Sequence, residues 1–426
     1  MIELHNISRI VGHADLEVDI GKEGVKAKFK ILNDPRFIEA IVVGKKFHEV
    51  PRIVSRICGP CGLSHALTSA MAIENILGIE VSQVVKLLRE IAILGEVAEN
   101  HLLHLSLVAL PDYFLCKDVF EFAKTKPKLL KQVLSLRSNI SKIVGAIAGR
   151  LIHPNASIIG GFTRLPSKEK LEKLRDTLNE SLTPLADLVD MFMTYSFPEL
   201  EVANDLCVCI LEDYSFIGDK VTLSNGKCFS ASGYQQVLLE EVAPYTTSKQ
   251  VTAEGLPVYA GARARINLRA DSLSDQAKHY IKIRDVPSKN PFDNLRAQAV
   301  ELIHCIYDML TKIEDVIYLL SLGGSRRPSI KITEGEGVGV SEAPRGLLIH
   351  HYKLNGEGVV TYANIITPTA INSRHIEVAA SELVRTYFYE DLPLTELECY
   401  LEKLVQAYDP CLGCATHTIR ISIKEV

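Results

Sequence analysis

The sequence predicts an α+β fold that is predominantly helical, with a large helical bundle core and small sheets at its periphery. Helical periodicity extends over long stretches of the chain, whereas the alternation typical of strands covers only short runs. Two Cys-x-x-Cys pairs lie near opposite ends, Cys58 with Cys61 and Cys411 with Cys414. If both pairs bind one metal site, the two ends must meet. We therefore expect a single interdigitated domain over residues 1–426.

The N-terminal half predicts a pair of strands followed by helices. Residues 14–32 alternate apolar and polar side chains around Gly21-Lys-Glu-Gly24, as in two strands joined by a turn. Ser82 is placed to cap a long helix that runs to Leu110 and that Pro111 stops. The other helices expected here are residues 66–77, residues 118–150 with an interruption near Pro127, and residues 168–195, which Ser167 caps and which contain Pro184.

The C-terminal half predicts short strands before a second group of helices. Residues 200–265 contain mixed short strands and an Asn225-Gly226 turn. A long helix is expected at 293–320, ended by Gly323 and Gly324. Residues 325–346 are rich in Gly and Pro, which favours a functional loop. The remaining elements expected are a strand at 357–367 and helices at 374–388 and 394–407.

Composition narrows the class of protein. The net charge of −5 gives no reason to expect a nucleic-acid or membrane-surface partner. No run reaches about 18 apolar residues, so no spanning helix is expected. The N-terminus lacks the pattern of a signal peptide, and ten unpatterned cysteines favour a reducing, cytoplasmic compartment. We interpret the six cysteines outside the pairs as small buried hydrophobes: Cys116, Cys207, Cys209, Cys228, Cys305 and Cys399.

The two cysteine pairs are the main candidate for chemistry. Thiolates suit zinc, copper(I), iron–sulfur clusters and nickel. Structural zinc is the plain alternative, because it commonly takes four thiolates from two such pairs. However, zinc pairs usually lie within tens of residues of one another, and these two are far apart in the sequence.

Motifs around the cysteines resemble a known family. Arg56-Ile-Cys-Gly-Pro-Cys with His65 is similar to the first signature of the nickel–iron hydrogenase large subunit, and Asp409-Pro-Cys-Leu-Gly-Cys-Ala-Thr-His417 is similar to its last. Three further segments resemble its internal signatures: Gly149-Arg-Leu-Ile-His-Pro154 with Gly160-Gly-Phe162, Glu342-Ala-Pro-Arg-Gly346, and Thr367-Pro-Thr-Ala-Ile-Asn372. The residues of these motifs are most similar to those of the soluble cytoplasmic group, whose partner subunits couple to NAD(P) or reduce sulfur.

The resemblance implies the large-subunit fold of that family, with a Ni–Fe centre that interconverts H2 with protons and electrons. Cys58 and Cys411 would be terminal nickel ligands, and Cys61 and Cys414 would bridge nickel and iron. The iron would carry CO and cyanide. A terminal thiolate such as Cys411 would accept the proton when H2 is split.

The resemblance also assigns residues around the metals. Arg345 would be a fixed charge above the metal pair; outside this motif it would be read as a surface ion pair. Asp112 and Asp409 would orient Arg345 or the cluster, although Asp409 could instead cap a turn. Pro344 and Thr369 would contact the cyanides. His65 would donate to a bridging thiolate; as an isolated histidine it would be read as a core residue.

A second metal is implied at the C-terminal motif. Glu39 falls where the family has a carboxylate ligand of Mg2+, and the carbonyl of Ile365 and His417 would complete the protein ligands. For Glu39 alone, a solvated helix face is nearly as good an interpretation. Members of the family are cleaved by a maturation endopeptidase after the residue matching His417, which here would remove residues 418–426.

One residue departs from the family pattern. The family motif Arg-x-Glu-Gly-His reads Arg9-Ile-Val-Gly-His13 here, so Val11 replaces the glutamate that relays the proton. Because valine carries no proton, another group must relay it or turnover is impaired.

Three functions remain as hypotheses. The first is a hydrogenase catalytic subunit that acts on H2 and passes electrons to an iron–sulfur small subunit, and then to a flavin- and NAD(P)H-binding subunit or to sulfur. The second is a non-catalytic electron-transfer subunit, although the respiratory relative with this fold has lost the cysteines. The third is a zinc-stapled interaction protein.

Overall fold

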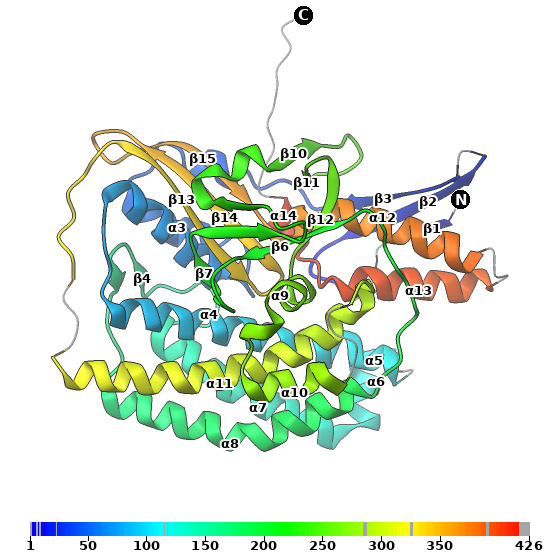
Figure 1. Cartoon of the computed structure of the whole chain (residues 1–426), viewed down its shortest axis with the longest axis horizontal. Coiled ribbons are helices and arrows are strands. Elements are labelled where there is room, and N and C mark those ends of the chain that lie inside the picture. Colours follow the sequence, from blue (N-terminus) through cyan, green and yellow to red (C-terminus); the bar gives the residue numbers. More distant parts are fainter. Residues whose placement is uncertain are drawn as a thin grey trace, which may run out of the picture.

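The computed structural model describes residues 2–5, 7, 10–22, 24–114, 116, 118–283, 288–323, 327–388 and 392–416. Its helices are α1 Ile38–Val42, α2 Val50–Val54, α3 Gly62–Leu77, α4 Gln83–Leu103, α5 Leu110–Tyr113, α6 Val119–Thr125, α7 Pro127–Ala148, α8 Lys168–Met193, α9 Ala262–Arg269, α10 Asp275–Ile283, α11 Asn294–Ser321, α12 Pro368–Phe388, α13 Leu394–Ala407 and α14 Leu412–Ala415. The long helices α4, α7, α8 and α11 pack on one another as a bundle, with the sheets on one side of it (Figure 1). The helical bundle with small sheets is as predicted.

Most helices begin where the sequence indicated, but α3 begins at Gly62 rather than at residue 66, and α12 begins at Pro368 rather than at residue 374. The Ser82 hydroxyl oxygen accepts the Val85 N–H (3.4 Å), and the Ser167 hydroxyl oxygen accepts the Lys170 N–H (3.3 Å). The chain also breaks before Pro127, as expected. The prediction that Pro111 stops the long helix is wrong. After α4 the chain continues as a π-helix, His104–Ala109. Pro111 lies in the first turn of α5, where the backbone N–H that proline lacks is not needed for a helical hydrogen bond.

The strands form separate small sheets. They are β1 Ile2–Leu4, β2 Ala14–Gly21, β3 Gly24–Ile31, β4 Ser157–Ile158, β5 Gly161–Phe162, β6 Leu206–Ile210, β7 Ile217–Gly218, β8 Lys220–Leu223, β9 Cys228–Ser230, β10 Leu238–Val242, β11 Lys249–Ala253, β12 Leu256–Tyr259, β13 Gly335–Ala343, β14 Gly346–Leu354 and β15 Val360–Ile366. Their spatial orders are β1-β2-β3, β10-β11-β12-β6-β8-β9, β15-β14-β13-β7 and β4-β5. The predicted strand pair at 14–32 and the strand at 357–367 are confirmed.

The segment predicted as a functional loop is in part a buried strand. Residues 335–343 form β13, which pairs antiparallel with β14 and lies against α3. A Cβ atom added to Gly339 would lie 2.7 Å from the Ala72 nitrogen and closer still to the Thr68 oxygen. The glycines therefore allow a strand to approach a helix closely, a role that composition alone does not distinguish from a loop.

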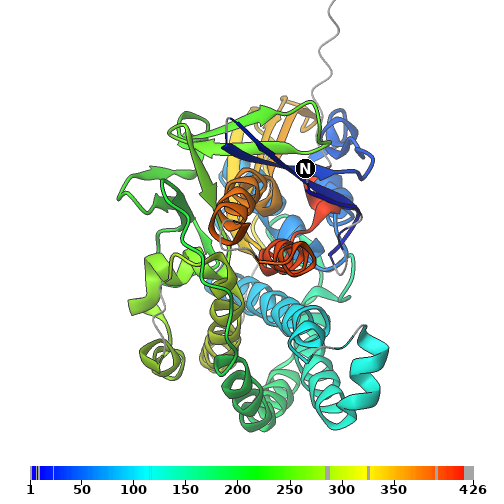
Figure 2. The same cartoon turned by 90° about the vertical axis from the view of Figure 1, so that its right-hand side faces the viewer.

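The two ends of the chain come together beside α3. The carbonyl of Val11 accepts the Leu412 N–H (2.9 Å), and the Arg36 side chain donates to the carbonyls of Ile57 and Gly413. Figure 2 shows the blue N-terminal segments and the red C-terminal helices side by side, with the bundle seen nearly end-on below them.

The burial of side chains tests two further expectations, one about a membrane span and one about the remaining cysteines. The stretch Gln83–Tyr113 has the length and hydropathy of a membrane span, but 83% of its apolar window is buried inside the protein, as in the core helix of a globular fold. Four of the six cysteines outside the pairs are buried as expected, whereas Cys228 and Cys399 are exposed. For these two the interpretation as core residues is wrong, because each lies on the outward side of an edge strand or surface helix.

Candidate metal centre

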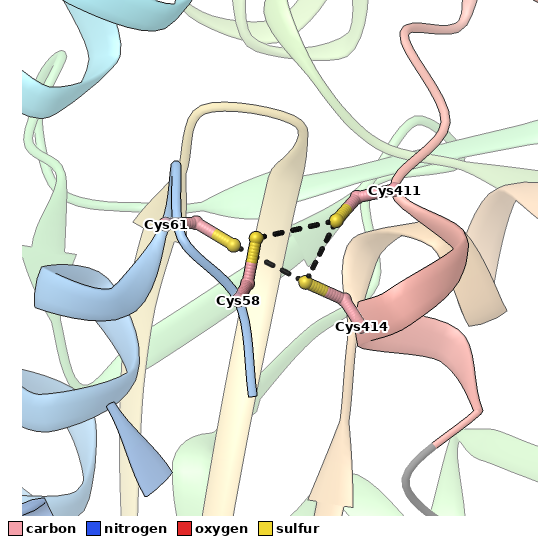
Figure 3. A group of neighbouring side chains, drawn as sticks. All are labelled: Cys58, Cys61, Cys411 and Cys414. Carbon is pink, nitrogen blue, oxygen red and sulfur yellow. Dashed lines mark hydrogen bonds between the residues drawn. The ribbon is translucent and has the colours of Figure 1, made fainter. Parts of the chain in front are cut away.

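Four buried sulfur atoms form one cluster. The Sγ atoms of Cys58, Cys61, Cys411 and Cys414 all lie within 4.8 Å of one another, and they are the one such group of candidate metal ligands among the described residues. Neighbouring sulfurs are 3.3 Å apart for Cys58 and Cys411, 3.2 Å for Cys61 and Cys414, and 3.1 Å for Cys411 and Cys414 (Figure 3). Each pair contributes from its own end of the chain, so the sequence prediction of a shared cluster is confirmed.

Helix starts hold both pairs in place. Cys61 immediately precedes α3 and Cys411 immediately precedes α14, so each motif turns from extended chain into helix at the cluster. The first N–H groups of α3 are accepted by a carboxylate from α4: Glu96 binds the N–H groups of Leu63 (2.8 Å) and Ser64 (2.9 Å). Glu96 carries no signal in the sequence, because nothing local links it to a loop some thirty residues earlier.

Arg345 lies in the turn between β13 and β14. Its Nε donates to the backbone carbonyl of Asp409, and its Nη2 donates to the Asp409 carboxylate at 2.9 Å. Burial by itself would lower the pKa of Arg345, but Asp409 and the thiols of Cys411, Cys61 and Cys58 outweigh it and hold that pKa well above its usual value. Arg345 is thus a buried fixed cation beside the cluster, not a surface ion pair.

One nitrogen of Arg345 is left over. Nη1 is buried and has no hydrogen-bond partner among the described residues. A buried guanidinium N–H without an acceptor is costly, so its presence beside the sulfurs fits a site made for a further group. This observation, together with four converging thiols, supports the metal-centre interpretation.

Asp409 is held by both of its carboxylate oxygens. One accepts from Arg345, and the other accepts from the Asn100 amide at 2.7 Å. Its backbone has φ of 50°, which aspartate tolerates better than most residues. The contact with Arg345 fits the first interpretation of Asp409, and its positive φ fits a place in a turn. Asn100 was not singled out from the sequence, because an asparagine within a helix carries no local signal.

Thr369 and Pro344 lie where the last motif meets the others. The Thr369 hydroxyl oxygen accepts the Cys411 N–H at 3.0 Å, which fixes the backbone of one ligand. Pro344 is buried and directly precedes Arg345. The hydroxyl of Thr367 is buried without a partner among the described residues, so this corner has unused donor capacity.

His65 is the inner end of a hydrogen-bonded chain. It is buried on α3, and its Nδ1 lies 3.0 Å from Nε2 of His350. The Nδ1 of His350 is in turn 2.6 Å from the Tyr352 hydroxyl. This chain fixes the orientation of the His65 ring, which is what a histidine beside a metal thiolate requires.

The residues expected at the second metal are partly brought together. The Ile365 N–H donates to Glu39 Oε1 at 2.7 Å, so these two meet across the chain. Lys249 supplies a positive charge 3.7 Å from the same carboxylate. His417 and the tail 418–426 lie outside the described residues. The carbonyl of Thr416, which precedes His417, accepts the backbone N–H of Arg36 at 3.0 Å, and Arg36 is close in sequence to Glu39.

The other two predicted residues lie on different parts of the chain. Asp112 lies on the short helix α5 and is partly exposed. Val11 forms an isolated parallel bridge with Cys411, and its side chain is 41% exposed. Val11, which stands where the family motif has glutamate, therefore lies next to a cluster cysteine.

Comparison with known proteins agrees with this site. A family model described as nickel-dependent hydrogenase matches residues 36–135 and 295–417, which include both cysteine pairs. The alpha subunits of sulfhydrogenases 1 and 2 from Pyrococcus furiosus are 32% and 34% identical, each over 99% of this chain and 98% and 100% of their own lengths. One chain of the F420-non-reducing hydrogenase from Methanothermobacter thermautotrophicus is 30% identical over 98% of this chain and 95% of its own length.

Solved structures give the same fold. A chain of an NAD+-reducing [NiFe]-hydrogenase in the H2-reduced state superposes with a TM-score of 0.86 at 25% identity, covering 98% of this chain and 99% of that one. The Ni-Fe-Se hydrogenase from Desulfomicrobium baculatum superposes with a TM-score of 0.76 at 20% identity, covering 98% of this chain and 100% of that one.

Proposed function

This chain belongs to the nickel-dependent hydrogenase family and is a hydrogenase catalytic subunit, and on that premise we propose that it cleaves H2 heterolytically and reversibly at the four-cysteine site. The observation that carries the proposal is the buried cluster of four sulfurs with the unpartnered Nη1 of Arg345 beside it. A nickel–iron centre bound there, with CO and cyanide on iron, supplies the redox-active Lewis acid at which H2 is polarised.

Each residue then has a defined task. Cys58 and Cys411 would hold nickel, and Cys61 and Cys414 would hold both nickel and iron. Arg345 stays charged, because Asp409 and the thiols hold its pKa high, so it stabilises the separating charges without exchanging its own proton. The Cys411 thiolate accepts the proton.

Polar groups around the centre position its diatomic ligands. Pro344 and the hydroxyls of Thr367 and Thr369 would contact bound cyanide. The Thr367 hydroxyl has no partner among the described residues, and the Thr369 hydroxyl, whose oxygen accepts the Cys411 N–H, still has a proton to donate. His65, oriented by His350, would donate to a cluster sulfur and tune the metals held there.

A second ion stabilises the C-terminal motif. We assign Mg2+ to Glu39, the carbonyl of Ile365 and His417, because Mg2+ prefers oxygen ligands and retained waters. The contact between Glu39 and Ile365 supports this assignment. Cleavage after His417 by a maturation endopeptidase fits the same site, because His417 would then be the terminal residue.

Electrons leave through a partner protein. Beyond the four-cysteine group, the described residues contain no further cluster of candidate metal ligands. Two exposed apolar side chains lie close to the cysteine motifs, beside the charged Arg36. Ile152 lies 3.9 Å from the Cβ position of Gly59, and Phe37 follows Arg36, whose side chain donates to the carbonyls of Ile57 and Gly413. These exposed side chains suit docking of an iron–sulfur small subunit. From there, electrons would pass through a flavin-binding subunit to NAD(P), or to sulfur; the names of the relatives include an NAD+-reducing hydrogenase and a sulfhydrogenase.

The test uses the chain purified with its partner subunits. Nickel and iron at one each per chain, CO and cyanide bands in the infrared spectrum and H2-dependent dye reduction are the expected results. None of the ten cysteines forms a disulfide bond, so purification under reducing conditions keeps the site as it is. Zinc alone, with no diatomic bands and no H2-dependent reduction, would show that the motifs serve as a structural staple instead.

A further inference from the structure

A second buried arginine lies behind the turn that carries Arg345. Arg265, on α9, is 2% exposed. Its Nε and Nη2 bind both carboxylate oxygens of Glu301 on α11, at 2.6 and 2.7 Å. Its Nη1 binds the carboxylate of Glu342 on β13 at 2.7 Å. One planar guanidinium thus joins three elements that are distant in sequence.

The same guanidinium reaches the backbone of the turn itself. Nη1 lies 3.4 Å from the Ala343 carbonyl and Nη2 lies 3.5 Å from the Pro344 carbonyl, the two residues before Arg345. The turn also packs tightly against the start of α9. Gly346 has φ of +126°, and a Cβ atom there would lie 2.5 Å from the Gly261 nitrogen. The turn therefore has little freedom to move relative to Arg265.

Arg345 needs two anchors to act as a fixed charge. Its guanidinium is anchored by Asp409, and Nη1 is left to face the reacting group. The position of Nη1 also depends on where the Arg345 backbone lies, and Asp409 does not fix that. Transition-state stabilisation depends on such placement, because a donor displaced by a fraction of its contact distance loses most of its effect.

We propose that Arg265, held by Glu301 and Glu342, is a positioning residue that sets the place of Arg345 over the metal centre. This inference rests on the proposed function, because it assumes that Arg345 acts on H2. Nothing in the fold alone requires an ion network here. A buried ion pair often contributes little net stability compared with apolar packing, so a network of three charges indicates a requirement for geometry.

The network is built as a rigid unit. Tyr214 donates to Glu301 at 2.5 Å, and His101 is hydrogen-bonded to the same carboxylate at 2.7 Å. The Ile210 N–H donates to Glu342 at 2.9 Å. Each carboxylate is therefore fixed from its far side as well. Lysine at position 265 would keep the charge, but it could not make the bidentate contact and still reach the turn carbonyls.

The experiment compares Arg265→Lys with wild type in the complete, metal-containing complex. We expect normal nickel and iron content, altered g values in the nickel electron paramagnetic resonance spectrum, and H/D exchange reduced by about 10- to 100-fold. The matched control is Arg89→Lys. Arg89 is also 2% exposed and binds Glu74 through two nitrogens, at 2.7 and 2.6 Å, but it lies away from the turn. The control should keep wild-type g values and exchange.

Wild-type spectrum and exchange in metal-loaded Arg265→Lys would overturn the proposal. If that variant does not acquire metal, Glu301→Gln is measured in the same way, because it weakens the network without removing Arg265. A shifted spectrum with reduced exchange in Glu301→Gln supports positioning, and a wild-type result overturns it. Loss of metal in both variants, but not in Arg89→Lys, would mean that the network is needed for assembly of the metal centre. That result would also overturn the positioning proposal. Failure of the proposed function itself would appear separately, as absent nickel or absent exchange in wild type.

Discussion

At the scale of single residues, the site combines family residues with one replacement. Val11 lies beside Cys411, where a glutamate would receive the proton from the thiol. Its side chain is 41% exposed, so water can reach this position in the chain as described. We therefore expect water to carry the proton on the first step, and proton transfer is the step that this replacement slows.

Restoring the carboxylate tests that idea. Val11→Glu should raise H/D exchange by about 100-fold or more if proton transfer limits the rate, because a positioned general base contributes that much. Val11→Gln is the matched control, since it has the same shape without a titratable proton, and it should leave exchange near wild type. Equal rates in all three proteins would mean that proton transfer is not limiting. The measurement is mass-spectrometric H/D exchange at fixed H2.

At the scale of elements, the site depends on close packing around α3. Helix α3 follows Cys61, and β13 leads to Arg345, so their contact places the first cysteine pair relative to the arginine. Gly339 permits that contact. The free space at this residue is smaller than a methyl group. A closely packed interior cannot make room for a methyl group without strain.

Gly339→Ala should therefore destabilise the protein by about 1–3 kcal/mol, the usual cost of overpacking. It should also lower H2 turnover, because α3 and the Arg345 turn would separate. Gly356→Ala is the control: nothing lies within 4 Å of its added Cβ atom, so its stability should match wild type. Denaturant unfolding of both variants provides the measurement. A neutral Gly339→Ala would show that the helix and strand can shift apart freely.

The start of α3 also carries a pH dependence. Burial raises the pKa of Glu96 to about 7, against its hydrogen bonds with Ser64 and Leu63, which lower it. The folded protein therefore keeps a proton on Glu96 that the unfolded chain loses near pH 4.5. Stability contributed by this residue is present below about pH 4.5 and is lost as the pH rises through about 7.

Glu96→Gln should remove that slope. Between those two pH values the stability of wild type relative to the variant should fall by about 3 kcal/mol, because each pKa unit corresponds to about 1.4 kcal/mol. Urea unfolding at several pH values, from about pH 5 to about pH 8, would show it. Parallel curves for the two proteins would mean that helix N–H groups, rather than burial, decide the charge of Glu96.

At the scale of the whole molecule, the metal site joins the two ends of the chain. Cys58 and Cys61 precede α3, Cys411 precedes α14 and Cys414 lies within it. Asp409 links the C-terminal motif to both Arg345 and Asn100. A centre bound to all four sulfurs exists only in the folded chain, so its binding energy adds to the stability of the fold.

Removal of one ligand should therefore act globally. Cys414→Ser should lose nickel and should be less stable than the metal-loaded wild type by about 3 kcal/mol or more. Cys399→Ser, at an exposed cysteine on α13, should keep both nickel and stability. Metal analysis and thermal unfolding check both variants. Equal stability of Cys414→Ser and loaded wild type would show that the fold closes without the metal.

The sequence by itself determined the helical character, most helix starts and the identity of the cluster. Those features are local: Ser82 and Ser167 cap the helices that follow them, and each Cys-x-x-Cys pair contains its own ligands. Only the tertiary structure decided the parts that depend on distant neighbours. Glu96, Asn100 and Arg265 act on segments far away in the chain, and the glycines of β13 matter because α3 lies against them. Local sequence records propensity and capping, whereas close approach and buried charge pairing exist only between elements that folding brings together.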